Sequence, residues 1–330
     1  MVISLIGLLV AVSLPAVHAA REASRRAFCR NSLKQIGIAL QGYASDHQVF
    51  PAAKGFEPGF KISPAGLKDG YRDYSAHCYL LPYLDQRNVY NSVNFDLGVP
   101  DWWELSQPTK VSLANTTVMG MSISVFLCPT DPNAISTSPG RNSYRANVGI
   151  GLCGDSGGCG VEDGRGALLH GEFVKISDVF DGMTNTIAFS EKVCGGATQQ
   201  FSPETDFVFI DSSFDCRRID SDWMVSKCRG VTQPVAKFFT GAGYTWSVGG
   251  TKYTSYTHAG PPNSPSVDCA IRGVKPPCGA FGARSRHPRG VNSLFCDGAV
   301  QFIGSSIELT LWRALGTRNG GEVVAAADGF

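Results

Sequence analysis

The sequence lacks several patterns that would identify a nucleic-acid-binding or zinc-binding protein. It contains 11 cysteines but no C-x-x-C pair, the usual signature of a structural zinc site. Its net charge is only +1, and no basic stripe interleaved with aromatic residues follows the first 34 residues, so nucleic acid is not an expected partner. With 43% hydrophobic and 17% charged residues, the 330-residue chain is predicted to fold into one large domain or two.

Cysteine is the residue whose abundance says most about the compartment. Eleven cysteines are many for a reducing cytosol, so their number and clustering predict disulfides and export. Three pairs lie close in the sequence: Cys153 with Cys159, Cys216 with Cys228, and Cys269 with Cys278. We expect Cys269 and Cys278 to be bonded, because they flank a proline-rich segment with little regular structure to order it.

The first 17 residues contain no charged side chain. A run of this length is close to the minimum that spans a hydrocarbon core, so residues 1–20 are predicted to be an apolar membrane segment. A cleaved signal peptide is the alternative, since Val17-His18-Ala19 offers small residues to a signal peptidase. Against cleavage, several arginines crowd the segment just after the cut, and early positive charge hinders translocation.

No proline interrupts the chain between Ala19 and His47. Apolar residues recur there at steps of three and four, which is typical of a helix with one apolar face. We predict one helix over residues 2–47, with residues 21–50 as an amphipathic continuation packed on a sheet and Pro15 bending the apolar part. The packing stripe consists of Leu33, Ile36, Leu40 and Tyr43, and it ends at His47.

The order of an apolar half-helix, an amphipathic continuation and a β-rich remainder resembles type IV pilins and pseudopilins. Residues 14–51 resemble the opening of a large bacterial family with prepilin-type N-termini and a C-terminal motif of His, nine residues, then Asp-Gly. That family is abundant in planctomycete-type bacteria and its function is largely uncharacterised. Residues 77–91, 126–132, 142–149, 176–192 and 261–269 resemble its internal landmarks, and residues 195–260 resemble it least.

The resemblance implies an α+β fold in which a long N-terminal helix packs on an antiparallel, β-rich head of residues 51–330, with residues 195–260 as an insertion. It implies a non-enzymatic structural or secretion-associated protein, anchored in the inner membrane by its helix, with the head in the periplasm or at the cell surface. Other pilin-like subunits or a secretion machinery would be its partners. The glycine cleavage site and glutamate of prepilins do not occur in this N-terminal segment.

The tail carries the family motif as His287, nine residues, Asp297 and Gly298. Strand-like runs flank Asp297-Gly298, a pair that favours a two-residue type I′ hairpin turn, with Phe295 opposite Val300. His287 and Asp297 could supply half of a metal site, but a structural pair between imidazole and carboxylate is favoured because no further ligands stand out.

Calcium is the one cofactor that the resemblance suggests, since pseudopilins bind it in their heads. Asp181, Asn185 and Glu191 supply suitable oxygen atoms, although their spacing is not that of an EF-hand. Turn and strand polar groups that satisfy the backbone are the favoured alternative, so no cofactor is expected beyond this calcium.

Two other functions remain open. A surface-anchored solute- or glycan-binding module would use the loops of residues 195–290, with a deep apolar pocket lined by Trp223, Trp246 and Tyr256. Arg284, Arg286 and Arg289 around His287 could accept an anionic glycan or phosphate.

A trypsin-like serine peptidase is the more remote alternative. Gly-Asp-Ser-Gly-Gly at residues 154–158 and the segment around His77 resemble its two motifs, but they lie too close together for two β-barrels. The triad would be His77 and Ser156 with one of three aspartates: Asp85, Asp96 or Asp101.

Overall fold

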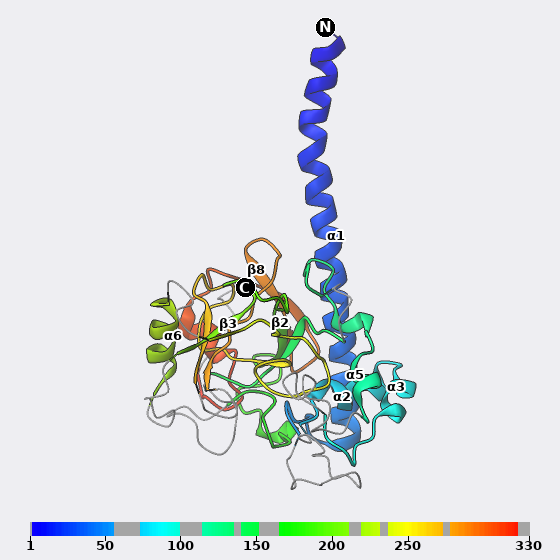
Figure 1. Cartoon of the computed structure of the whole chain (residues 1–330), viewed down its shortest axis with the longest axis vertical. Coiled ribbons are helices and arrows are strands. Elements are labelled where there is room, and N and C mark those ends of the chain that lie inside the picture. The colour runs from blue at the N-terminus through cyan, green and yellow to red at the C-terminus, as the bar shows by residue number, and fades with distance from the viewer. Residues whose placement is uncertain are drawn as a thin grey trace.

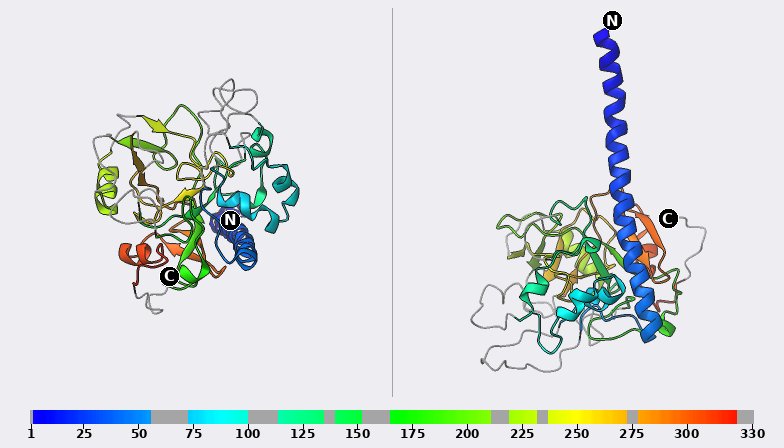
Figure 2. Two further views of the ribbon diagram at one scale, coloured as in Figure 1. Left: turned by 90° about the horizontal axis from the view of Figure 1, so that it is seen from below. Right: turned by 90° about the vertical axis from the view of Figure 1, so that its right-hand side faces the viewer.

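A computed structural model describes residues 2–55, 73–99, 114–134, 140–151, 165–210, 219–231, 237–272 and 278–322. The chain is an α+β protein with one long N-terminal helix and two mixed sheets. Helix α1 runs without a break from Val2 to His47, so the predicted single helix is confirmed, with Pro15 inside it. Figures 1 and 2 show its N-terminal part projecting well beyond the head, while its C-terminal part lies along one side.

The first sheet lies against α1. Its strand order is β5-β1-β2-β8-β9, and only the β1–β5 pair is parallel. Its strands are β1 (Tyr144–Asn147), β2 (Ile187–Glu191), β5 (Ser255–Tyr256), β8 (Gly290–Phe295) and β9 (Val300–Gly304). Strands β8 and β9 contact α1 directly, so the C-terminal hairpin rather than the chain's nearest neighbours in sequence supports the helix.

A second sheet has the order β4-β3-β6-β7. Its strands are β3 (Phe207–Ile210), β4 (Phe238–Phe239), β6 (Asp268–Ile271) and β7 (Gly279–Ala280). The sequence predicts an antiparallel head. The structure differs, because β3 pairs with β6 in parallel. Residues 195–260 contribute β3 and β4 here, yet they also give β5 to the first sheet, so this segment is shared between both sheets.

Short helices surround the sheets. They are α2 (Ala76–Leu80), α3 (Arg87–Ser92), α5 (Thr116–Met119), α6 (Ser221–Arg229) and α7 (Leu309–Ala314), with 3₁₀ turns η1 (Leu81–Tyr83), η2 (Ser124–Phe126) and η3 (Ile176–Asp178). α2, η1 and η2 pack against α1, so the helix is held from the sheet side and from the side of these turns.

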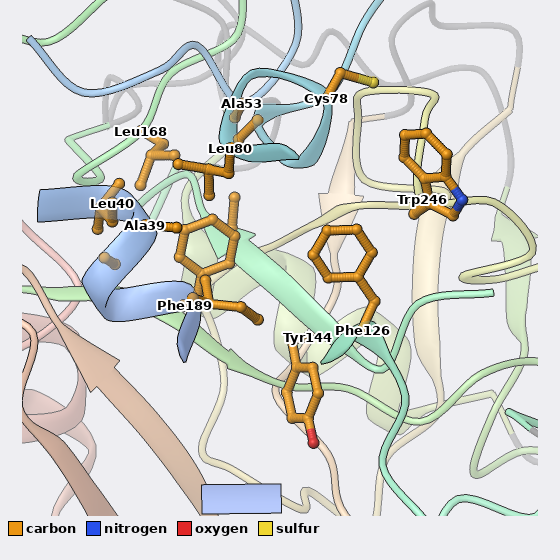
Figure 3. Close-up of a cluster of buried hydrophobic side chains, with 14 of the residues drawn as sticks. Ala39, Leu40, Ala53, Cys78, Leu80, Phe126, Tyr144, Leu168, Phe189 and Trp246 are labelled. Atoms are coloured by element: carbon orange, nitrogen blue, oxygen red, sulfur yellow. The ribbon is translucent and has the colours of Figure 1, made fainter. Parts of the chain in front are cut away.

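The predicted packing stripe of α1 forms the centre of the main core. Leu33, Ile36 and Leu40 are fully buried and Tyr43 is nearly so. They meet side chains of α2 and the first sheet, including Phe189 (Figure 3). Full burial of a leucine or isoleucine side chain contributes about 1.5–3 kcal/mol, so this stripe fixes the lower half of the helix to the head.

The hairpin turn differs from the predicted two-residue type I′ turn. Phe295 N donates to Ala299 O at 2.8 Å and Gly298 N donates to Phe295 O at 2.9 Å, which closes a three-residue loop. Only Gly298 among the loop residues has a positive φ, +85°, as in a type I turn followed by a bulge. The extra residue shifts the register by one, so that Leu294 rather than Phe295 pairs with Val300.

The expected aromatic pocket is not formed. Trp246 packs in the main core, and Tyr256 lies in a separate cluster around β8 and α7. Trp223, on α6, contacts a third cluster beneath the second sheet. The three rings therefore pack in three different clusters and do not line one pocket.

The sequence predicts that residues 1–20 form a membrane segment. In the part of the chain that the structure describes, no helix combines the length and apolar character needed to cross a membrane.

Candidate functional site

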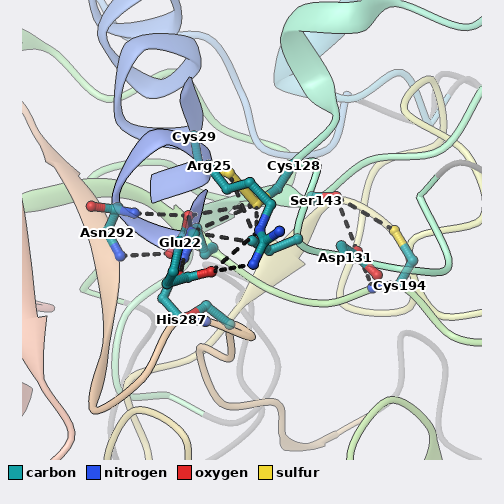
Figure 4. Close-up of a disulfide and its surroundings, with 12 residues drawn as sticks. Glu22, Arg25, Cys29, Cys128, Asp131, Ser143, Cys194, His287 and Asn292 are labelled. Atoms are coloured by element: carbon teal, nitrogen blue, oxygen red, sulfur yellow. Dashed lines mark hydrogen bonds and ion pairs between the residues drawn. A yellow bond between two sulfur atoms is a disulfide. The ribbon is translucent and has the colours of Figure 1, made fainter. Parts of the chain in front are cut away.

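A disulfide joins α1 to the head. Cys29, fully buried on the inner face of α1, is bonded to Cys128, with their Cα atoms 5.2 Å apart and 99 residues between them in the sequence. Because Cys128 follows η2, the bond ties the middle of the helix to a loop on the turn side of the head (Figure 4). The upper half of α1 therefore begins at a covalently fixed point.

His287 lies directly beside this disulfide. Its Nδ1 atom donates to Glu22 Oε1 at 2.6 Å, and its Nε2 atom lies 3.2 Å from Glu191 Oε1 and 3.7 Å from Cys128 Sγ. We call these five residues the clasp: Glu22, Cys29, Cys128, Glu191 and His287. The His287 side chain is fully buried, whereas Glu22 on the outer turn of α1 keeps 23% of its side-chain surface exposed.

Both glutamates favour a protonated imidazole. Burial by itself would lower the pKa of His287, but hydrogen bonds and charges from Glu191 and Glu22 outweigh that effect and raise it above its usual 6.5. Burial likewise opposes the charge of Glu22, yet His287 and Arg25 lower its pKa below 4.5. The two glutamates therefore favour the charged imidazole and, with it, an ion pair between helix and head.

Two hydrogen bonds from Asn292 of β8 orient the Glu191 carboxylate. The Asn292 backbone N–H donates to Glu191 Oε2 at 2.7 Å, and its side-chain amide donates to Oε1 at 3.0 Å. Glu191 is 2% exposed, so a carboxylate without these donors would be costly to bury. Strands β2 and β8 thus hold the Glu191 carboxylate at a fixed position beside His287.

The other end of the motif also contacts α1. Lys34 Nζ donates to the Gly298 carbonyl at 2.7 Å, and the Gln41 amide donates to the Cys296 carbonyl. The turn lies so close to Gly37 that a Cβ atom there would come within 3.3 Å of the Gly298 Cα atom. Glycine at position 37 allows helix and turn to approach this closely.

The spacing of the motif matches a length of helix. From Glu22 to Gln41, α1 rises about 28 Å at 1.5 Å per residue. A fully extended chain from His287 to Gly298 could reach about 36–40 Å, so the β8 strand between them has enough length to run along the helix. The nine intervening residues therefore allow His287 and the Asp-Gly turn to contact two separate points of α1.

The predicted pair of His287 and Asp297 is not formed. Both ring nitrogens of His287 face glutamates, while the Asp297 carboxylate accepts from the backbone N–H of Ala299 at 2.8 Å within the turn. The two residues stand at opposite ends of β8 because an extended strand carries them apart.

The three suggested calcium ligands do not converge. Asp181 accepts from the backbone N–H groups of Gly320 and Gly321 at 2.7 and 2.9 Å, which fastens the C-terminal segment. Asn185 donates to the Asp181 backbone carbonyl, and Glu191 belongs to the clasp. The three side chains therefore satisfy local backbone and side-chain partners, which is the arrangement that the sequence favours over calcium.

The predicted bond between Cys269 and Cys278 is wrong. Cys269 of β6 is bonded to Cys228 of α6 instead, with Cα atoms 5.3 Å apart and 41 residues between them. Cys278 lies buried just before β7, where its neighbour Gly279 pairs with Ala270. Pairing of β6 with β7 settles the geometry of this segment, so a local disulfide is not what orders it.

The basic patch around His287 is largely neutralised. Arg284 is buried and pairs with Asp268 at 3.0 Å, and Arg286 pairs with Glu204. A surface depression with a cavity volume of ≈ 10 Å³ lies beside the clasp and is lined by Cys128, Thr130, Asp131, Ser143, Glu191, Val193, Arg284, Ser285 and Arg286. It is smaller than the roughly 300–1,000 Å³ of typical small-molecule sites.

His77 occupies a closed core position. Its Nε2 atom lies 2.8 Å from the Tyr144 carbonyl oxygen, and the ring stands edge-on to Phe126 and Phe189. Complete burial lowers its pKa to about 4, so the imidazole is neutral at physiological pH. Such a position gives the side chain no route to a substrate in the described structure.

The remaining members of the suggested peptidase triad do not extend this site. Ser156 and Asp101 lie outside the described residues. Asp85 and Asp96 are exposed, whereas His77 is fully buried.

Sequence reasoning identified His287 and Glu191, but it assigned them to two different sites. It missed Glu22, Cys29 and Cys128 altogether. The available signal was weak: Cys29 falls on the predicted inner face of α1, one helical turn before Leu33, and Glu22 is the only acid between residues 1 and 45. Their partners lie 99 and 265 residues away, beyond any local pattern.

Comparison with curated proteins and with solved structures gives no significant match. A family model named SBP_bac_10 and described as a protein of unknown function (DUF1559) matches residues 18–310, which include the clasp and the whole of the β8–β9 hairpin. The chain therefore belongs to the DUF1559 family of proteins of unknown function.

Proposed function

We propose that the protein is a non-enzymatic structural subunit of the cell envelope, pilin-like or pseudopilin-like, which assembles through the projecting half of α1. The observation that carries this proposal is the division of one helix into two environments. Below Cys29 the helix is held by the head, and above it the described side chains from Ser13 to Arg21 are exposed.

The exposed half is apolar enough to need cover. Leu14 and Val17 keep 54% and 47% of their surface exposed on the projecting part of α1, and the sequence before them carries no charge. Apolar surface in water is unfavourable, and a subunit helix of the same kind is a complementary cover for it. Parallel packing of several such helices would place the heads side by side.

The two disulfides support an oxidising location for the head. Cys29 lies within α1 itself, so export would carry at least the helix from that residue onward out of the cytosol. This agrees with an inner-membrane anchor formed by the N-terminal residues and a head in the periplasm or at the cell surface.

Crosslinking in the native host tests the assembly. A photoreactive residue at Val17 should join two copies of the chain in envelope fractions, whereas one at Phe180, which is 77% exposed on the head, should not. Deletion of residues 2–20 should leave a folded, monomeric head, because the packing on the head begins after that segment. Recovery of the full chain as a soluble monomer, with no crosslink from position 17, would refute the proposal.

Binding of a solute or glycan is the second candidate, and only the depression beside the clasp favours it. Thr130 and Ser143 offer hydroxyl groups there, and Arg286 offers a partly exposed guanidinium. Its cavity volume of ≈ 10 Å³ holds about one water molecule, so a solute or glycan would bind on the surface around Arg286. Glycan-array binding that is lost in Arg286→Ala would support this function over assembly.

A further inference from the structure

We propose that the clasp is a latent metal site: once the Cys29–Cys128 disulfide is reduced, it binds one Zn²⁺ through Cys29, Cys128, Glu191 and His287. One ligand atom from each of these four residues lies within 4.8 Å of every other. The inference depends on this geometry alone and is independent of the proposed assembly.

The distances among the ligand atoms suit a tetrahedral ion. Zinc–sulfur bonds of about 2.3 Å and zinc–nitrogen or zinc–oxygen bonds of about 2.0–2.2 Å place tetrahedral ligands about 3.3–3.8 Å apart. His287 Nε2 lies 3.2 Å from Glu191 Oε1 and 3.7 Å from Cys128 Sγ, and Cys128 Sγ lies 4.0 Å from Glu191 Oε1. The two bonded sulfur atoms have to separate to a similar distance, and the remaining ligand atoms already lie within 4.8 Å of one another.

The surrounding residues already form the outer shell that such an ion requires. Zinc-bound histidines usually donate their second N–H to a carboxylate, and His287 Nδ1 donates to Glu22. Ligating carboxylates are themselves held by hydrogen bonds, and Asn292 holds Glu191 with two. These partners fix the tautomer that leaves Nε2 facing the sulfur atoms.

Access and burial also fit. All four ligand side chains are buried, which excludes competing water, while Cys128 and Glu191 line the surface depression. The depression has room for about one water-sized particle, which is enough for a single metal ion beside Cys128 and Glu191. A zinc site would account for the position of His287 beside two cysteines.

The chemistry balances with a thiol reductant. Two thiols transfer two electrons and two protons to the disulfide, which becomes a pair of cysteine thiols while the reductant becomes its own disulfide. Binding of Zn²⁺ then releases the two thiol protons and any proton on His287 Nε2 to solvent. A small-molecule disulfide reverses the process: it takes two electrons from the two thiolates and two protons from solvent, becomes two thiols, and the ion is expelled as the Cys29–Cys128 bond forms.

The test uses the full chain, reduced with a phosphine under anaerobic conditions and supplied with Zn²⁺ or Co²⁺. We expect one tightly held equivalent of zinc, protection of Cys29 and Cys128 from alkylation, and thiolate-to-cobalt charge-transfer absorption. Glu22→Gln, which removes a positioning residue and leaves the ligands, should weaken zinc binding by about 10–100-fold. The oxidised chain should bind no zinc at this site.

A matched pair of variants controls for the other disulfide. Cys228→Ser/Cys269→Ser should retain the bound zinc, whereas Cys29→Ser/Cys128→Ser should lose it. His287→Gln should also lose it, and because this variant keeps its disulfide it can fold before reduction. Unchanged zinc binding in the Cys29/Cys128 variant, no binding by the folded reduced wild type, or unfolding of the reduced chain despite added zinc would each overturn the proposal.

Discussion

Glu22, which lies where α1 leaves the head, accepts a hydrogen bond from His287 at 2.6 Å, although 265 residues separate the two in the sequence. The contact joins the point at which the helix leaves the head to a histidine that lies just before β8. It makes the attachment of α1 depend on two titrating groups, and this dependence can be measured.

We predict that the contribution of the clasp to the free energy of unfolding is greatest, and nearly constant, over a limited range of pH. The raised pKa of His287 gives stability that is fully present below its unfolded value of 6.5 and lost as pH rises through the higher folded value. The lowered pKa of Glu22 gives stability that is present above 4.5 and lost as pH falls through the lower folded value. The plateau therefore spans mildly acidic pH.

Chemical denaturation of wild type and His287→Gln across this pH range measures the effect. The variant should be less stable by about 1–3 kcal/mol on the plateau, and the difference should shrink as pH rises through the raised pKa of His287. A difference that stays constant from mildly acidic to alkaline pH would show that His287 acts by packing alone.

The buried stripe of α1 should contribute far more stability than its outer face. Leu40→Ala removes a fully buried side chain from the main core and should cost about 2–5 kcal/mol. Ile38→Ala changes a residue of the same helix that is 62% exposed, and it should cost less than about 1 kcal/mol. Equal losses in urea denaturation would contradict the observed orientation of the helix.

The left-handed glycine of the hairpin should be specifically required. Gly298→Ala places a side chain at φ +85°, and should destabilise the protein by about 1–2 kcal/mol. Space is not the reason, because the nearest atom to an added Cβ lies 3.6 Å away. Gly304→Ala, at the other end of β9 and with comparable room, is the control and should be close to neutral in thermal denaturation.

Peptide mapping without reduction should recover Cys228 linked to Cys269. Closing 41 residues constrains the unfolded chain by about 4 kcal/mol in the entropic model, so Cys228→Ser should lower stability by several kcal/mol. Cys278→Ser should keep the linked peptide intact. A peptide that joins Cys269 to Cys278 would contradict the structure.

The sequence by itself determined α1, the packing stripe and the presence of a C-terminal hairpin. Each of these depends on neighbours within a few residues: a proline-free run, apolar steps of three and four, and Asp-Gly between two strands. It failed at the exact turn, because a type I turn with a bulge and a type I′ turn accept the same Asp-Gly pair. The observed register is the one in which Leu294 packs closely against Gly37 of α1, a contact between distant segments that local sequence does not reveal.

Only the tertiary structure decided the disulfides and the clasp. Cys269 had a cysteine nine positions away, yet the parallel pairing of β3 with β6 places it against α6 and Cys228. Likewise His287 had an acid ten positions away in Asp297, but an extended strand separates them and the path of α1 brings Glu22 and Cys29 to the histidine instead. Local pattern fixes the conformation of a segment, whereas contacts between distant segments depend on how the sheets pack.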